Sequence, residues 1–300
     1  AADGNYNNHI GVPLTVLRVN KEHDIAIIEM GANHENEITY LCEIAKPNYG
    51  IITNIGKAHL EGFKNIEGVK KTKKELYDYI KTNNGKIFIN NEDTILKEIS
   101  KDIKIISYGL NGEINGRIKE SSIFTNVEFN SQIIETKLIG TYQFYNIMLS
   151  IAVATHFGIK LKNISKALSS YKPSNNRSQV IKTKFNTIIL DAYNANPSSM
   201  YEMINSFSKI QNKNKICILG DMAELGEYSK KEHLNLIHLL ENLKINCLFV
   251  GNEFSKLNST GSFFDVENLI NYLKKKQIKD STILVKGSRS IKLEKVIKIL

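Results

Sequence analysis

The chain has 300 residues, of which 42% are hydrophobic and 24% are charged, enough for about two domains with hydrophobic cores. This composition excludes a disordered tail and a small disulfide-stabilised fold. No apolar run approaches the ~18 residues that span a bilayer, and the N-terminus lacks the basic and apolar segments of a secretory signal. We therefore expect a cytoplasmic protein without membrane insertion.

Charge and cysteine usage narrow the function classes further. The formal net charge of +9 suggests anionic partners. Because Lys residues are spread over the whole chain, without a basic stripe, an aromatic platform or zinc-finger spacing, we expect phosphate-bearing small molecules and no nucleic acid. Cys42, Cys217 and Cys247 lie far apart in apolar segments, which indicates buried thiols rather than disulfides or metal ligands.

The first half of the chain alternates strand-like and helix-like segments. Apolar runs at 25–30 and 50–55 flank a periodic stretch at 36–45 that ends before Pro47, which is a βαβ pattern and predicts a parallel sheet. The remaining predicted elements are strands at 86–89 and 103–108, an antiparallel ribbon at 114–139 and a helix at 145–156.

A polar segment with a proline, residues 171–177, separates this region from a second periodic one. We place the domain boundary there, with domains at 1–173 and 174–300. The second domain has apolar runs between helical stretches, at 187–190, 216–219, 247–250 and 283–285. The predicted fold class is therefore α/β in both domains.

Polar residues follow several predicted strands at the end where ligands bind in open parallel sheets. They are Glu29, His59, Asp191, Asp221 and Lys286. One such residue is commonly just solvated, but five across two sheets favour a ligand cleft between the domains.

The helix expected from Ile66 onward places one lysine on its apolar side. The apolar stripe consists of Ile66, Val69, Leu76, Tyr77 and Ile80. At ~100° per residue, Lys73 lies ~12° from the centre of this stripe, whereas Lys71 and Lys74 lie ~172° and ~112° away. Lys73 is predicted to face inward, where desolvation lowers its pKa and favours a neutral, reactive amine. A side chain that extends back to the surface is the alternative.

Six motifs occur in a diagnostic order along the chain. The first half carries Gly-Asn-Tyr-Asn-Asn-His-Ile-Gly-Val-Pro-Leu-Thr at 4–15, Ile-Glu-Met-Gly-Ala at 28–32 and Thr-Asn-Ile-Gly-Lys-Ala-His-Leu-Glu-Gly-Phe at 53–63. The second half carries Asp-Ala-Tyr-Asn-Ala-Asn-Pro-Ser-Ser-Met at 191–200, Leu-Gly-Asp-Met-Ala-Glu-Leu-Gly at 219–226 and Val-Lys-Gly-Ser-Arg-Ser at 285–290. Together they resemble the Mur ligases, in particular the branch that adds a dipeptide.

The resemblance implies the remainder of a central parallel-sheet ATPase domain with an antiparallel ribbon, followed by a Rossmann-like C-terminal domain. The glycine-rich phosphate loop of the family is not in this sequence. The nearest match, Gly50 to Gly56 followed by Lys57, has five intervening residues where four are needed, and Ala58 stands where a hydroxyl would bind magnesium. The chain thus resembles the C-terminal two-thirds of the enzyme, and we expect it to have no ligase activity alone.

The implied reaction is ATP-dependent amide ligation in peptidoglycan precursor synthesis. The carboxylate of UDP-N-acetylmuramoyl-tripeptide is phosphorylated and then attacked by the amine of D-alanyl-D-alanine. ATP and two Mg²⁺ ions are implied, one ion being held through a carbamylated lysine, and we expect a monomer. A related Mur or folylpolyglutamate-type ligase and a non-catalytic fragment are the alternatives.

The resemblance also implies a metal site and a nucleotide site. Glu29 and His59 match magnesium ligands, and Lys73 matches the lysine that is carbamylated, so His59 and Lys73 are the implied catalytic residues. Without the family, a solvated Glu29 and a hydrogen-bonded His59 are the simpler interpretation. The implied nucleotide residues are Asn146, Arg177, Asp191, Tyr193 and Asn194. An Asx-rich loop would also explain 191–196. Residues 140–146 read Gly-Thr-Tyr-Gln-Phe-Tyr-Asn, where the family commonly has Gly-x-His-Asn-x-x-Asn, so Asn146 is retained while Tyr142 and Gln143 depart from the pattern. Capping of a helix would also explain Asn146.

The implied substrate residues lie in three loops. Asn7 and Asn8 match the wall that contacts the muramoyl peptide. Asp221, Glu224, Lys286, Ser288 and Arg289 match the surroundings of the dipeptide, where backbone amides and cations suit a carboxylate. The alternative for the last three is a simple turn.

Overall fold

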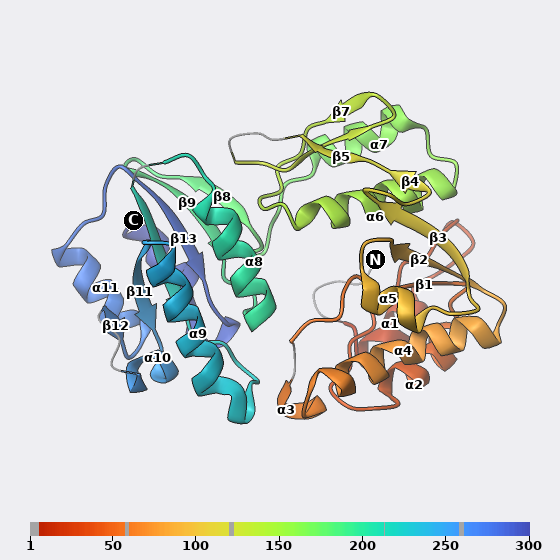
Figure 1. Ribbon diagram of the computed structural model, residues 1–300, viewed down its shortest axis with the longest axis horizontal. Coiled ribbons are helices and arrows are strands. Elements are labelled where there is room, and N and C mark those ends of the chain that lie inside the picture. Colours follow the sequence, from red (N-terminus) through yellow and green to blue (C-terminus); the bar gives the residue numbers. More distant parts are fainter. Residues whose placement is uncertain (1–5, 58–59, 120–122, 213, 258–260) are drawn as a thin grey trace. The chain divides into compact units, whose positions relative to one another are not determined.

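The computed structural model describes residues 6–57, 60–119, 123–212, 214–257 and 261–300 (Figure 1). Backbone contacts divide the chain into two compact units. The first unit comprises residues 1–116 and 148–159, and the second comprises 117–147 and 160–300. The boundary predicted at 173/174 stays a prediction, as does the cleft between the domains.

The first unit is built on a four-stranded parallel sheet in the order β1-β2-β3-β4. Its strands are β1 (Tyr49–Ile51), β2 (Lys86–Asn90), β3 (Lys104–Gly109) and β4 (Ile114–Asn115). Its helices are α1 (Gly11–Val16), α2 (Glu37–Ala45), α3 (Leu60–Phe63), α4 (Ile66–Thr82) and α5 (Thr94–Ile99), with the C-terminal part of α6 (Gln143–His156). The predicted parallel sheet is confirmed.

Helices cover both faces of this sheet. Tyr77 and Ile80 of α4 and Leu96 of α5 form one buried core with Ile87 and Ile89 of β2. On the other face, the rings of His156 and Phe157 contact Tyr49, and His156 also contacts Phe88. Alternate residues of β2 therefore point to opposite layers, as the period of a strand requires.

The strand predicted at 25–30 is wrong. The segment forms no strand within the described part of the chain, and Ile25 and Ile27 are exposed by 44% and 65%. Its β-branched residues predict an extended backbone, but a strand also needs a neighbour whose N–H and C=O groups pair with it. The strand predicted at 50–55 is present but ends at Ile51.

The second unit is built on a six-stranded sheet in the order β12-β11-β10-β13-β9-β8. The strands are β8 (Gln179–Lys182), β9 (Asn186–Asp191), β10 (Lys215–Gly220), β11 (Asn246–Val250), β12 (Ser262–Phe263) and β13 (Ser281–Lys286). All neighbours are parallel except β8 and β9. The four strands predicted here are confirmed, whereas β8 and β12 were not predicted.

This sheet also has helices on both faces (Figure 1). Ile188, Leu190, Ile283 and Val285 point to a core formed with α11 (Val266–Lys275) and the 3₁₀ helix η3 (Leu293–Lys298). Helices α8 (Pro197–Ser208) and α9 (Ser229–Asn242) cover the opposite face. The remaining elements are α10 (Asn252–Lys256) and the 3₁₀ helices η1 (Gly226–Tyr228) and η2 (Arg289–Ile291).

The predicted ribbon is a three-stranded antiparallel sheet, β5 (Arg117–Lys119), β6 (Asn126–Phe129) and β7 (Gln132–Ile134). Helix α7 (Leu161–Ser170) packs beside β7, where Gln132 Nε2 donates to Ser165 Oγ at 3.1 Å. The beginning of the predicted ribbon differs, because β4 pairs in parallel with β3.

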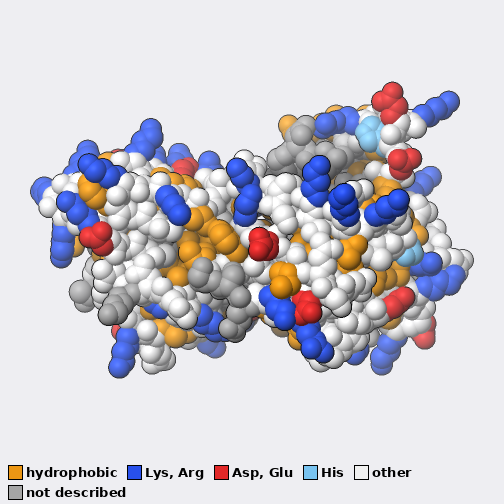
Figure 2. Space-filling model, turned by 90° about the horizontal axis from the view of Figure 1, so that it is seen from above, with side chains coloured by type: hydrophobic (Ala, Val, Ile, Leu, Met, Phe, Trp, Pro, Cys, Tyr) orange, Lys and Arg blue, Asp and Glu red, His pale blue; other side chains and the backbone are white. Residues whose placement is uncertain are grey.

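Surface and cysteine features agree with the composition. Lys and Arg side chains are distributed over the face shown in Figure 2 rather than gathered in a stripe. Cys42, Cys217 and Cys247 are free thiols. Cys42 and Cys217 are buried as predicted, whereas Cys247 is only half-buried. Within the described residues, no helix is long and apolar enough to cross a membrane.

Candidate functional site

A buried ion pair joins two predicted site residues at the carboxyl ends of adjacent strands. Lys286 of β13 and Asp191 of β9 lie side by side in the parallel register. Lys286 Nζ lies 2.6 Å from Asp191 Oδ2 and donates to the carbonyl oxygen of Asn194 at 3.3 Å. The side chains are only 3% and 14% exposed, and such groups require partners to offset their desolvation.

The other carboxylate oxygen of Asp191 holds the loop that carries Arg177. Asp191 Oδ1 accepts from Ser178 N at 2.9 Å and from Ser178 Oγ at 3.3 Å. The guanidinium of Arg177 lies 4.0 Å from the centroid of the Tyr193 ring, a cation–π contact. Arg177, Asp191, Tyr193 and Asn194 are therefore brought together.

The Asx-rich loop after β9 also has a structural role. Asn194 Oδ1 accepts from Ala195 N at 2.8 Å, and Asn196 Oδ1 accepts from Ser199 N at 2.9 Å to cap α8. Helix α8 begins at Pro197, a residue whose fixed φ suits the first helical position. Asn194 itself is exposed, so its amide nitrogen is accessible to a ligand.

Asp221 holds the N-terminus of α10 in the second unit. Its carboxylate accepts from Glu253 N at 2.8 Å and from Phe254 N at 3.1 Å. Gly251, with φ at +129°, permits this approach, because a Cβ there would lie 2.3 Å from the carboxylate. Burial raises the pKa of Asp221 above its ordinary value.

A buried histidine completes the surroundings of Asp221. His233 Nε2 accepts from Met222 N at 3.1 Å, and Nδ1 lies 2.8 Å from Ser229 O. The ring therefore fits its neutral form with the proton on Nδ1. These contacts hold the turn after β10, which includes Glu224, an exposed residue with φ at +60°.

The loop after β13 is tied to the same turn. Ser288 N and Ser288 Oγ donate to the carbonyl oxygen of Asp221, at 3.1 and 2.6 Å. Arg289 is exposed and pairs with Glu294 at 2.8 Å. Of the residues predicted to surround the dipeptide, Asp221 and Ser288 are thus brought together, while Lys286 is directed to the predicted nucleotide residues.

In the first unit, a predicted metal ligand lies beside a predicted substrate residue. Asn7 Nδ2 donates to Glu29 Oε1 at 3.0 Å, and Gly31 N donates to Asn7 O at 2.7 Å. Asn8 instead accepts from Ile10 N and Gly11 N at the start of α1. Glu29 is exposed, and a carboxylate has lone pairs beyond the one that Asn7 uses.

Lys73 is half-buried on α4, and its Nζ donates to the carbonyl oxygen of Asn54 at 3.0 Å. Burial lowers the pKa of Lys73, whereas Lys71 Nζ pairs with Glu35 at 2.5 Å on the surface. The predicted inward orientation of Lys73 is confirmed, and the pKa shift has the predicted direction. Glu75 anchors the same helix to α2, since its carboxylate accepts from Asn36 N at 2.7 Å and Thr39 N at 2.9 Å.

Two domain models of the Mur ligase family match this chain. The model of the Mur ligase middle domain matches residues 1–154, and the model described as Mur ligase, glutamate ligase domain matches residues 176–289. The chain belongs to the Mur ligase family. The family resemblance in the motifs is therefore confirmed.

Individual Mur ligases are similar over almost the whole chain. The UDP-N-acetylmuramoyl-tripeptide–D-alanyl-D-alanine ligase of Buchnera aphidicola subsp. Baizongia pistaciae is 35% identical over 99% of this chain and 68% of its own length. The Escherichia coli ligase of that name is 31% identical over 99% and 70%.

Solved Mur ligase structures agree with the fold. MurF from Acinetobacter baumannii has a TM-score of 0.88 at 30% identity, with 99% of this chain and 69% of that one covered. The MurF ligase from Thermotoga maritima in complex with ADP has a TM-score of 0.85 at 27% identity, with 99% and 72% covered. The predicted α/β fold class is confirmed.

The segment 140–146 contains Tyr142, which directly precedes α6, and Asn146, which lies within it. Asn146 is the fourth residue of α6, inside the helix rather than at its N-cap, and its Nδ2 donates to Gln143 Oε1 at 2.9 Å. Tyr142, a departure from the family motif, has its hydroxyl 3.5 Å from Ser178 Oγ. Burial, followed by the charge of Asp191, raises the pKa of Tyr142 to about 12. Tyr142 therefore lies next to the loop of the predicted nucleotide residues. The sequence did not predict this proximity.

Two of the predicted metal ligands, Glu29 and Lys73, lie in the described part of the chain and suit magnesium chemically. Within the described ranges, no three His, Cys, Asp or Glu side chains could hold a metal ion together, and His59 lies outside those ranges. Glu29 supplies the oxygen that Mg²⁺ prefers, and the lowered pKa of Lys73 favours the neutral amine that forms a carbamate. Glu29 and a carbamylated Lys73 are thus chemically suited to bind Mg²⁺. Their roles as metal ligands stay predictions.

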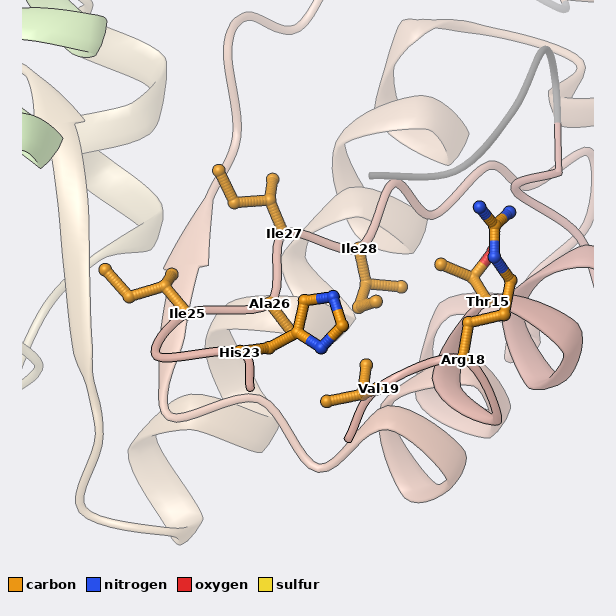
Figure 3. A pocket seen from close by; sticks show the side chains of 8 residues that line it. All are labelled: Thr15, Arg18, Val19, His23, Ile25, Ala26, Ile27 and Ile28. Atoms are coloured by element: carbon orange, nitrogen blue, oxygen red, sulfur yellow. The ribbon is translucent and has the colours of Figure 1, made fainter. Parts of the chain in front are cut away.

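A separate cavity of about 250 Å³ lies in the first unit (Figure 3). Its lining residues are Thr15, Arg18, Val19, His23, Ile25, Ala26, Ile27 and Ile28. None was predicted as a site residue. The lining is mostly apolar and includes the segment 25–28, which pairs with no strand in the described part of the chain.

Proposed function

We propose that this chain carries two-thirds of an ATP-dependent ligase that joins D-alanyl-D-alanine to UDP-N-acetylmuramoyl-tripeptide. Ligases named for that reaction match 99% of the chain. The observation that carries the proposal is the convergence of Arg177, Tyr193 and Asn194 around Asp191 at the strand ends. A similar structure, the Thermotoga maritima MurF ligase, is a complex with ADP.

The second unit supplies groups suited to a nucleotide. The planar guanidinium of Arg177 can bind phosphate oxygens in a bidentate manner, and Tyr193 holds it by stacking at 4.0 Å. Asn194 offers an amide donor next to a backbone that Lys286 restrains. We assign these residues to ATP, and Asp221, Glu224, Ser288 and Arg289 to the neighbourhood of the dipeptide.

The first unit supplies groups suited to magnesium and to the muramoyl tripeptide, whose carboxylate accepts the phosphoryl group. Glu29 and Lys73, the latter as a carbamate, would ligate Mg²⁺, with His59 as a further ligand. Magnesium would neutralise charge on the phosphates during transfer to the tripeptide carboxylate. Asn7 orients Glu29 through their 3.0 Å hydrogen bond and borders the proposed muramoyl peptide site. Positioning and water exclusion account for most of the expected acceleration.

Product formation tests the proposal directly. The complete gene product that contains residues 1–300 is mixed with ATP, magnesium, UDP-N-acetylmuramoyl-tripeptide and D-alanyl-D-alanine, and the pentapeptide product is measured by mass spectrometry. Arg177→Ala and Asn194→Ala should each raise the KM for ATP about tenfold or more, because each removes a charged or polar contact. Arg117→Ala, on an exposed strand, is the matched control.

Two results would contradict the proposal. If the unmodified protein forms no pentapeptide but adds glutamate to a folate substrate, it is a folylpolyglutamate-type ligase instead. A change in the KM for D-alanyl-D-alanine alone in Arg177→Ala and Asn194→Ala would show that these residues do not serve the nucleotide.

A further inference from the structure

Lys286 is held entirely by groups of the proposed nucleotide site. All six residues of β13 are buried, and the Lys286 side chain at its end is 3% exposed. Its ammonium bonds to Asp191 Oδ2 at 2.6 Å and to Asn194 O at 3.3 Å. An ammonium in this position has little surface to offer a dipeptide.

The backbone that follows Lys286 is held by the proposed dipeptide site. Gly287 passes so close to Gly220 that a Cβ on Gly287 would lie 2.8 Å from the Gly220 Cα. This approach lets Ser288 donate twice to the carbonyl oxygen of Asp221. Residues 286–288 therefore connect the turn after β9 with the turn after β10.

Lys286 is also connected to Arg177 through two intermediate residues, Asp191 and Ser178. Lys286 occupies Asp191 Oδ2, which leaves Oδ1 to accept from Ser178 N and Oγ. Ser178, at φ +47°, adopts the left-handed conformation that those bonds stabilise. Ser178 is adjacent to Arg177, so these contacts connect the ion pair to the backbone that carries the guanidinium, which lies 4.0 Å from the centroid of the Tyr193 ring.

We propose that Lys286 is a positioning residue that couples the nucleotide loop to the dipeptide loop, and not a contact of the dipeptide. The inference rests on the proposed function and deepens it. Asp191 is the group through which Lys286 acts. Loss of the ammonium lets the Asp191 carboxylate turn away from Ser178, and displacement of Arg177 and Asn194 follows.

The test compares three variants in the complete gene product: Lys286→Met, Asp191→Asn and the double variant. Lys286→Met should raise the KM for ATP about tenfold to a hundredfold, because small misplacements of binding groups have effects of that size. It should also raise the KM for D-alanyl-D-alanine. Since both residues act as one unit, the double variant should be no worse for ATP than Lys286→Met alone.

Melting temperatures separate positioning from mere stability. Removing both charges is expected to restore most of the melting temperature that Lys286→Met loses, because no unpaired buried charge remains. The KM for ATP should stay raised in that restored protein. Lys295→Met, which removes an exposed ammonium from a pair with Glu267, is the matched control and should change neither quantity.

Each other outcome contradicts the inference in a recognisable way. A rise in the KM for the dipeptide alone would make Lys286 a dipeptide contact. Recovery of both melting temperature and KM in the double variant would make the pair purely structural. If the unmodified protein forms no pentapeptide, the proposed function fails; if it does and Lys286→Met matches it, only the coupling fails.

Discussion

Replacing Asp221 by alanine tests whether this residue serves stability or the dipeptide. Its carboxylate accepts from two backbone N–H groups, of Glu253 and Phe254, at the start of α10. Phe254 is fully buried and packs against His233 and Phe249. Alanine would leave both N–H groups without their acceptor, and water has poor access to at least the Phe254 amide.

The expected loss follows from these contacts. A buried donor left unsatisfied costs about 1–3 kcal/mol, so two give about 2–6 kcal/mol. Part of this is offset, because burial raises the pKa of Asp221 and its removal relieves the desolvation of a charge. A net loss of about 2–4 kcal/mol corresponds to roughly 5–12 °C in melting temperature for a domain of this size.

Thermal unfolding by circular dichroism measures the shift, with substrate kinetics on the same samples. Asp265→Ala is the matched control, because Asp265 is an exposed cap whose carboxylate accepts from Asn268 N. It should lose about 1 kcal/mol. The Asp221 carboxylate caps α10, whereas Ser288 bonds to the Asp221 carbonyl oxygen, which alanine retains. Asp221→Ala should therefore keep its KM for D-alanyl-D-alanine within about threefold at temperatures where it is folded.

An unchanged melting temperature would refute the assigned capping role of Asp221. If the KM for the dipeptide then rose strongly, the contact implied by the family resemblance would be the correct interpretation. Similar decreases in melting temperature for Asp221→Ala and Asp265→Ala would show that a cap of the buried Phe254 amide stabilises the protein no more than an exposed cap does.

Three further predictions concern a lysine and a glycine. In the complete gene product, Lys73→Ala should nearly abolish turnover, and added short-chain carboxylates should restore part of it, whereas Lys74→Ala should stay active. Normal activity of Lys73→Ala in bicarbonate-free buffer would exclude a carbamate at this position. Because burial lowers the pKa of Lys73, the unfolded chain binds its proton more tightly, so stability should rise with pH between that lowered pKa and the ordinary value of 10.5. Melting curves across this range should show the rise, and Lys73→Met, but not Lys71→Met, should remove it. Gly287→Ala should cost about 1–3 kcal/mol, measured by thermal unfolding, because its Cβ would meet the Gly220 backbone; unchanged stability would show that the loop can relax.

Much of the secondary structure follows from local patterns. The apolar runs of the second unit are strands whose ends lie within two residues of the predicted ones, because a buried parallel strand must be apolar on both faces. The stripe on α4 predicts the inward direction of Lys73, since helical spacing alone orients it. Segment 25–30 shows the limit: it has the residues of a strand, but strand formation also depends on a partner distant in sequence.

The sequence by itself determined the family, the α/β class and which loops carry polar residues, because motifs and periodicity are local properties. Only the tertiary structure decided how those residues pair. Lys286 and Asp191 are 95 positions apart, and their ion pair exists because β13 and β9 are neighbours in the sheet. Asp221 likewise reaches α10 across 32 positions. Such partners depend on strand order and on close backbone approach at Gly251 and Gly287, which no pattern along the chain encodes.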